Sequence, residues 1–339
     1  TGVQTCALPI LPIFNECKIS LMKELAPTLT SFTPFLTSVR LAPYQLTFDI
    51  TNDHELMGAY LWSQQAASAL YPLFHFVEIF IRNAIDKEAK RRFGEFWWNK
   101  ISYNETQYAC KCFIENIDNA KEKLERDWRK AETKRQGLKR GERLTDPCPE
   151  FSHDQIIAAT EFSTWTFILT NGFMKPKHLT DKKKEYLWPQ SLGKVFKHFN
   201  TLDSSPHKAL KSLNDNLTDI RNYRNRVFHH EPIWIKGETH KLNSIRAIET
   251  IRHKINKIED FIKLINLKVY QELYETNIFN NARRVCSKQE LEIYQGKATP
   301  NVIKDGEDFI LKRSRITTAQ LETISIDVGD QIFGFSRII

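Results

Sequence analysis

The sequence predicts an all-α protein, a helical bundle followed by a small C-terminal appendage that contains β-strands. Three observations predict this class. Hydrophobic residues make up 41% of the 339 residues, Gly and Pro number only 12 and 13, and apolar residues recur at helical spacing over long stretches. No repeat recurs at a fixed period, which argues against a solenoid. We therefore expect helices to dominate up to about residue 267.

Helix boundaries are expected at residues that commonly cap or stop helices. Asp53 can cap the first long helix, and Pro72 suits either a kink or the first turn of a second helix. Ser152 and Gln155 have the form of a capping box that opens a strongly apolar helix. The expected helices span about 53–93, 104–136, 152–172, 192–199, 206–231 and 242–267.

The chain is expected to divide into three segments. Residues 1–34 form a poorly assigned N-terminus, whose first dozen residues look like a translated sequencing-adapter read-through. Residues 35–267 form the helical domain. Residues 268–339 form a small mixed or β-containing extension, because polar and apolar residues alternate there between turn residues.

The charge and composition of the chain limit which partners and which cellular compartment are expected. The formal net charge of +8 favours polyanionic partners such as RNA. The six scattered cysteines include no CxxC pair, so we expect reduced thiols in the cytoplasm, without a disulfide framework or a zinc site. The richest apolar run, Leu70 to Ile81, is far shorter than the ~20 residues that a membrane span needs, so no membrane contact is expected.

The segment Ile220–Trp234, IRNYRNRVFHHEPIW, places charged side chains on a helix with a buried face. Helical spacing puts Arg224 inside the apolar stripe of that helix, where an isolated charge is costly and needs a partner. Arg221, Asn225 and His229 recur every four residues and form a polar ridge beside the stripe.

A partner for Arg224 is available on another helix. Glu78 and Arg82 form an i, i+4 pair within FHFVEIFIRNAI, and Glu78 could contact both arginines and orient them. Such a network can also be purely structural, and histidines near a helix end can simply cap carbonyl groups.

Four segments resemble the Abi family of phage abortive-infection proteins, the AbiD/AbiF-like group. They are RLAPY (40–44), YLWSQQAASALYPLFHFVEIFIRNAI (60–85), FGEFWW (93–98) and RNRVFHHEPIW (224–234), and the resemblance covers about residues 35 to 265. Within the last segment, RNRVFH matches the R-x4-6-H motif of HEPN ribonuclease domains. The resemblance thus implies a HEPN-like helical bundle, RNA cleavage, and a role in phage defence or as a toxin.

The resemblance also implies roles for individual residues and partners. Arg224, Asn225 and His229 take the catalytic places, and Glu78, Arg82, Arg221 and His230 support them; the spacing R-x5-H also fits His230. HEPN proteins pair two motifs across a two-fold axis, so we expect a homodimer, with an antitoxin or a regulatory RNA as a possible further partner.

The residues themselves suit cleavage of RNA without a metal or another cofactor. RNA carries its own nucleophile, the 2′-OH; a histidine can move the protons, and an arginine can hold the phosphate. The carboxylates near the motif, Asp215, Asp219 and Glu231, form no recognisable metal-ligand set with the histidines.

Two other classes remain open, a non-catalytic RNA-binding regulator that uses the same cleft and a scaffold in which the charges are structural. Further RNA contacts are expected from two basic stretches and four tryptophans. The stretch from Lys121 to Arg143 carries ten basic and five acidic side chains and could follow an RNA backbone. Lys182–Lys184 could do the same, with Trp97, Trp98, Trp128 and Trp188 as stacking surfaces, although such tryptophans are more often core.

Overall fold

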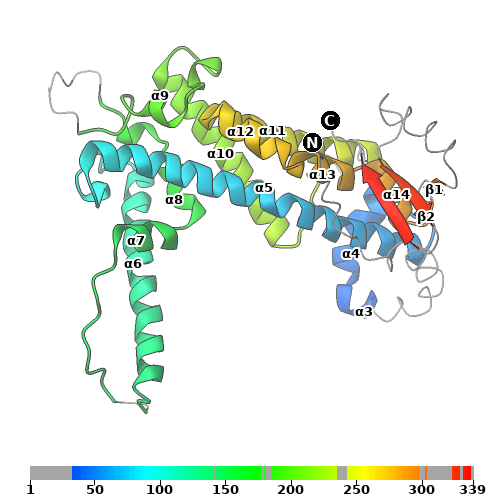
Figure 1. Ribbon diagram of the computed structural model, residues 1–339, viewed down its shortest axis with the longest axis horizontal. Coiled ribbons are helices and arrows are strands. Elements are labelled where there is room, and N and C mark those ends of the chain that lie inside the picture. The colour runs from blue at the N-terminus through cyan, green and yellow to red at the C-terminus, as the bar shows by residue number, and fades with distance from the viewer. Residues whose placement is uncertain are drawn as a thin grey trace, which may run out of the picture. The chain divides into compact units, whose positions relative to one another are not determined.

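The computed structural model in Figure 1 describes residues 33–139, 142–176, 179, 185–234 and 243–297. It also describes the backbone of residues 302–303, 323–328 and 331–336. The N-terminal stretch interpreted as a read-through and the basic run Lys182–Lys184 lie outside the described residues.

Helices predominate in the described part of the chain, as the sequence predicts. None of the described helices combines the length and the apolar character needed to cross a membrane. The α-helices are α3 (Thr33–Leu36), α4 (Ser38–Thr47), α5 (Asp53–Phe93), α6 (Tyr108–Arg135), α7 (His153–Ala159), α8 (Phe162–Phe167), α9 (Leu192–Val195), α10 (Pro206–Phe228), α11 (Ser244–Ile265), α12 (Leu267–Glu275), α13 (Ile278–Val285) and α14 (Lys288–Tyr294). Short 3₁₀ turns lie at η2 (Trp97–Asn99), η3 (Asn171–Phe173) and η4 (Phe199–Thr201).

The long helix α5 matches its expected span but begins with a different cap. Asn52, rather than Asp53, accepts the hydrogen bond from the backbone N–H of Glu55, at 2.9 Å. Asp53 is already the first helical residue, where its negative charge favours the positive end of the helix dipole. Pro72 lies inside this one continuous helix, so no second helix starts there.

The apolar stretch after Ser152 is not the single helix that the sequence predicts. The capping box of Ser152 and Gln155 is present, but α7 ends at Ala159 and α8 starts only at Phe162. Thr160 separates the two helices in an extended conformation, and its hydroxyl donates to the carbonyl of Ile157 at 2.7 Å. A side-chain hydroxyl that bonds its own backbone in this way competes with helix continuation.

The chain folds into two compact units, and α5, α10, α11 and α12 each contribute to both. The first unit comprises the chain up to Leu73, Asn225–Asn256 and the chain from Glu272. The second comprises Phe74–Arg224 and Lys257–Gln271. The division of the sequence at residues 34 and 267 stays a prediction.

An aromatic cluster forms the core of the first unit. The ring of Trp234 meets Tyr44 edge-on at 5.0 Å and Phe48 at 4.8 Å between centroids, and Phe48 in turn meets Trp62 at 5.7 Å. The polar edges of these rings are satisfied, because Trp234 Nε1 donates to Thr47 Oγ1 and Tyr44 donates to Ser63 Oγ. Burial raises the pKa of Tyr44 to about 12, so this hydroxyl stays a donor at all physiological pH values.

In the core of the second unit, one carboxylate, that of Asp86, contacts two buried ring side chains. Asp86 Oδ1 on α5 accepts a hydrogen bond from Trp97 Nε1 at 2.7 Å and lies 2.9 Å from His153 Nε2. The His153 ring stacks on Trp98, with centroids 5.3 Å apart. Trp97, Trp98 and Trp188 are therefore core residues, and the expectation that they could stack on RNA is wrong because their rings are fully buried.

Arg92 joins the loop before α9 to α5, and the neighbouring Arg91 binds a carboxylate of the same helix. Arg92 donates to the carbonyls of Leu187 and Tyr186 and to Ser191 Oγ, at 2.7 to 3.0 Å. Arg91 binds the buried carboxylate of Glu88 through two hydrogen bonds of 2.7 and 2.8 Å. The end of α5 therefore holds this buried loop through hydrogen bonds from a charged side chain.

Three short strands are described in the C-terminal segment. β2 (Thr323–Val328) and β3 (Gln331–Ser336) pair antiparallel, with Val328 opposite Gln331, and β1 (Val302–Ile303) pairs parallel with β2. The two long strands fall in the stretch where the sequence alternates. Between residues 267 and 294 the chain is helical, and a separate β-containing appendage stays a prediction.

Gly58→Ala is expected to destabilise the first unit. Alanine in a helix normally gains about 1 kcal/mol over glycine, but a Cβ at Gly58 would overlap the carbonyl oxygen of Tyr294. Overpacking of this kind typically costs ~1–3 kcal/mol, so the free energy of unfolding in urea should fall. Ser68→Ala, at an exposed position of the same helix, is the control and should change it by less than about 0.5 kcal/mol. A stabilised Gly58→Ala variant would contradict this packing.

Glu88→Gln is expected to lower stability at neutral pH and to matter less in acid. The hydrogen bonds from Arg91 hold the pKa of Glu88 below its ordinary value. The stabilisation is therefore complete above the unfolded-state pKa and is lost as pH falls through the depressed pKa. We expect a loss of about 1 kcal/mol at pH 7, since Arg91 is largely exposed and screened. Urea unfolding of both proteins at pH 7 and pH 4 measures the difference, which should shrink at the lower pH.

Candidate functional site

Helix α10 ends in a Schellman motif formed by the two histidines and the residue after them. His230 has φ +56°, in the left-handed region. Its backbone N–H donates to the carbonyl of Val227 at 3.2 Å, and the N–H of Glu231 donates to the carbonyl of Arg226 at 3.1 Å. These are the two hydrogen bonds that define the motif. The helix therefore stops at its own cap, before the predicted stop at Pro232.

Contacts from α4 hold this helix end in place. Arg40 Nη1 donates to the carbonyl of His230 at 2.9 Å, and the Trp234 ring is inserted into the aromatic cluster beside Tyr44. Arg40 and Tyr44 belong to RLAPY, while His230 and Trp234 belong to HHEPIW. Two of the segments that carry the family resemblance are thus in direct contact.

The motif residues are spread around the end of α10, with Asn225 between Arg224 and His229. The N–H of His229 donates to the carbonyl of Asn225 at 2.9 Å, so the helical pattern continues to His229. With about 100° per residue, His229 lies about 40° from Asn225, about 60° from Arg226 and about 140° from Arg224 around the axis. Asn225 is thus the nearest polar neighbour of His229 around the helix axis. The long side chain of Arg224 would have to extend around the helix to contact a ligand that His229 also contacts.

Burial differs among the motif residues. His229 and His230 are exposed, and Arg224 and Asn225 are half-buried. Arg224 lies between the buried side chains of Ile220 and Val227, as the helical spacing predicts. The motif therefore has one end in the apolar stripe of the helix and its other end, at the histidines, open to solvent.

The two histidines have different structural positions, which the sequence alone cannot separate. His230 provides the left-handed residue of the cap and its carbonyl is bound by Arg40. His229 has no such backbone role, and its side chain continues the ridge that starts with Arg221 and Asn225. The geometry therefore favours His229 as the functional member of the pair.

The expected network of Glu78 with Arg82 and Arg224 stays a prediction. Arg82 Nε donates to the neighbouring Asn83 Oδ1 at 3.3 Å. Glu78 and Arg82 are both part-exposed, so water can reach each charge. Arg221 Nη1 donates to Thr166 Oγ1 at 3.0 Å, which fixes this arginine against α8.

Sequence reasoning missed two basic residues near the histidines. Arg226 lies three residues before His229, and its Nε is 3.8 Å from a carboxylate oxygen of Glu231. Its i, i+3 spacing to His229 was a signal that could have identified it. Arg40 could not be found in this way, because it comes from α4, 190 positions from His230.

The predicted basic arm is a helix whose charges are largely paired. Along α6, lysines and arginines form ion pairs with acidic residues three or four positions away: Lys121–Asp118, Arg126–Glu122, Arg129–Glu125, Lys130–Asp127 and Arg135–Glu132. Arg135 also pairs with Asp146 in the segment after α6. Such pairing leaves less unbalanced positive charge for an RNA backbone than the composition predicts.

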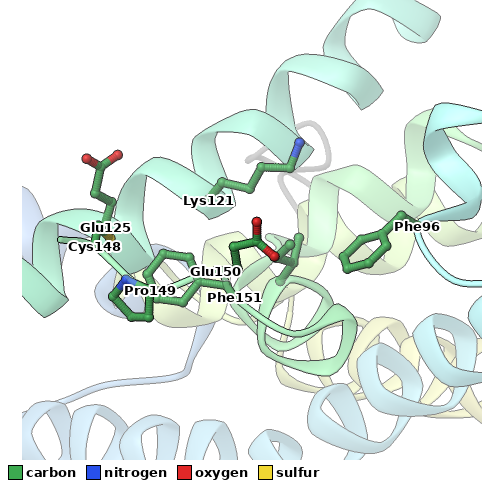
Figure 2. A pocket seen from close by; sticks show the side chains of 8 residues that line it. Phe96, Lys121, Glu125, Cys148, Pro149, Glu150 and Phe151 are labelled. Atoms are coloured by element: carbon green, nitrogen blue, oxygen red, sulfur yellow. The ribbon is translucent and has the colours of Figure 1, made fainter.

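A pocket of about 410 Å³ lies between α6 and the start of α7 (Figure 2). Figure 2 shows Phe96 on one side and Pro149 and Phe151 on the other, with the carboxylate of Glu150 between them. Glu125 and Lys121 complete its charged rim, together with Cys148 and Ile156 in the lining. Two carboxylates and one ammonium group disfavour a phosphodiester in this pocket.

His230→Gly is expected to stabilise the protein. The left-handed conformation costs a residue with a Cβ about 1 kcal/mol, which glycine avoids. We expect the melting temperature to rise, with a gain in the free energy of unfolding of up to about 1 kcal/mol. His229→Gly is the matched control and should lower stability, because the adjacent residue needs no positive φ. A loss of stability in His230→Gly would show that the imidazole of His230 has a structural role of its own.

Comparisons with protein-family models, curated proteins and solved structures find no match to this chain. Within the described residues there is no group of three or more His, Cys, Asp or Glu side chains that could hold a metal ion.

Proposed function

We propose that this protein is a metal-independent endoribonuclease of the HEPN type, an Abi-like protein of an abortive-infection or toxin system. The observation that carries the proposal is the exposed imidazole of His229, directly beyond the last turn of the helix that bears Arg224 and Asn225. The arrangement supplies a proton-transfer group that solvent can reach and a guanidinium on the same helix. Both are groups that cleavage of a phosphodiester needs.

The proposed reaction uses the nucleophile that RNA carries. Neutral His229 takes the proton of a 2′-OH, and the 2′ oxygen attacks the adjacent phosphorus. The bond from phosphorus to the 5′ oxygen breaks, and the leaving oxygen takes up a proton from the protonated His229 of a second copy of the chain. The products are a 2′,3′-cyclic phosphate and a 5′-hydroxyl end. With an ordinary pKa of about 6.5, a histidine can accept or donate this proton near neutral pH.

Arg224 and Asn225 would handle the phosphate. The planar guanidinium of Arg224 can donate two hydrogen bonds to the non-bridging oxygens and offset the charge that develops as phosphorus becomes pentacoordinate. Asn225, about 40° from His229 around the helix, can orient the imidazole or a phosphate oxygen. Arg40 and the cap at His230 would act as positioning groups, since they fix the backbone that carries His229.

In an in-line displacement the attacking 2′ oxygen and the leaving 5′ oxygen lie on opposite sides of phosphorus, so one imidazole does not contact both and a second proton-transfer group is needed. The chain contains one R-x4-H, from Arg224 to His229. Two copies related by a two-fold axis would bring two such motifs to one substrate. We therefore propose a homodimer as the active form, with RNA as the substrate and an antitoxin or regulatory RNA as a possible further partner.

Wild-type protein in excess EDTA is expected to cleave synthetic single-stranded RNA and to leave 2′,3′-cyclic phosphate ends. His229→Ala should lose about 10²- to 10⁴-fold in rate, with an unchanged melting curve because the side chain is exposed. The measurement is single-turnover cleavage, with end-group analysis by mass spectrometry.

His230→Gly is the control for this experiment, because it keeps the cap and should retain activity. A His229→Ala variant as active as wild type would refute the assignment of His229. Tight binding of RNA without cleavage by the wild type would favour the alternative, a non-catalytic RNA-binding regulator.

A further inference from the structure

An aromatic pair lies at the surface immediately before His229. The rings of Tyr71 on α5 and Phe228 on α10 have centroids 5.4 Å apart and an interplanar angle of 33°. Tyr71 is 53% exposed and Phe228 is 38% exposed, so part of each side chain meets solvent. Contiguous exposed apolar surface can mark a binding site.

The pair lies where the apolar stripe of α10 meets its polar face. Phe228 is about 40° from Arg224 and about 100° from His229 around the helix axis. On one side Phe228 borders the buried Val227 and on the other the polar ridge. A ligand that touches the Phe228 ring is thus within reach of the groups proposed to hold and cleave a phosphodiester.

Two arginines of α10 lie close to Phe228 around the helix axis. Arg224 is about 40° away and Arg221 is about 20° away, and Arg40 is bound to the carbonyl of His230. One acidic side chain, Glu231, pairs with Arg226 at the far edge. An aromatic surface flanked by cationic donors suits a ligand with a flat apolar part and an anionic part.

We propose that Tyr71 and Phe228 form a stacking site for one nucleobase of single-stranded RNA, next to the scissile phosphate. The base lies on the exposed part of the ring pair, and its own phosphate faces the arginines of α10. Every base has a π-face, so this site gives affinity and positions the strand with little sequence preference. The inference rests on the proposed function, whose site it extends.

A second copy of the chain is the competing occupant of this surface. In a two-fold contact centred on the pair, the same patch would face itself, so Arg224 beside Phe228 would approach its own counterpart. Like charges brought together in this way are unfavourable unless an anion lies between them. The charge pattern therefore favours a nucleotide over direct contact between copies.

The test measures binding of RNA that cannot be cleaved. Full-length protein is titrated into fluorescein-labelled 2′-O-methyl oligouridine of twelve nucleotides, which lacks the attacking hydroxyl, and into the same oligonucleotide with one abasic position. Anisotropy gives the Kd. Tyr71→Ala and Phe228→Leu should weaken binding of the intact oligonucleotide by about 5- to 100-fold, the range of one base stack.

Three comparisons make the result specific. Tyr71→Phe keeps the ring and should bind like wild type, and so should Tyr108→Ala, which removes an exposed aromatic residue on α6. An oligonucleotide whose abasic position falls at the site should bind wild type more weakly and should not distinguish wild type from Tyr71→Ala. Thermal melting confirms that Phe228→Leu is folded.

Equal affinity of wild type and Tyr71→Ala for the intact oligonucleotide would overturn the stacking site, as would no binding by the wild type at all. A variant that dissociates in sedimentation while its affinity stays unchanged would assign the surface to self-association instead. The proposed ribonuclease fails separately, if wild-type protein leaves cleavable RNA intact. A protein that cleaves RNA without using the pair refutes only this inference.

Discussion

The hydrogen bond from Arg40 to the carbonyl of His230 and the burial of Trp234 are the constraints on which the candidate site depends. A helix end normally frays, because its last four carbonyls lack partners within the helix. Here the Schellman hydrogen bonds satisfy two of those carbonyls, Arg40 binds the carbonyl of His230 just beyond the helix, and the aromatic cluster anchors the chain four residues after His230. The exposed His229 therefore stands on backbone that is fixed on both sides, which is what a group that transfers protons requires.

The same constraint explains why a bulky residue occupies a left-handed position. Glycine would adopt the conformation of His230 without strain, and backbone strain of this kind tends to collect at functional sites. The strain is offset by the hydrogen bond from Arg40 and by the packing of Trp234. His230 thus forms the left-handed residue of the cap, whereas the side chain of His229 is exposed to solvent. The two adjacent histidines therefore have different structural positions.

The charged residues away from the helix end have mostly structural partners. Arg221 binds Thr166, Arg92 holds the loop before α9, and the cations of α6 pair with acids one turn away. Much of the excess positive charge in the sequence therefore does not form one basic surface. At the end of α10, arginines lie beside partly exposed aromatic rings, and this co-location links the proposed chemistry with the proposed base-stacking site.

The sequence by itself determined the helical class, the spans of α5, α6, α10 and α11, the capping box at Ser152 and the position of Arg224 in an apolar stripe. These features follow from local spacing and caps, which a few neighbouring residues decide. Only the tertiary structure decided that Thr160 interrupts an apolar helix, that Trp97 is buried and that Arg40 reaches His230. Those outcomes depend on contacts between segments far apart in the sequence, for which periodicity holds no information.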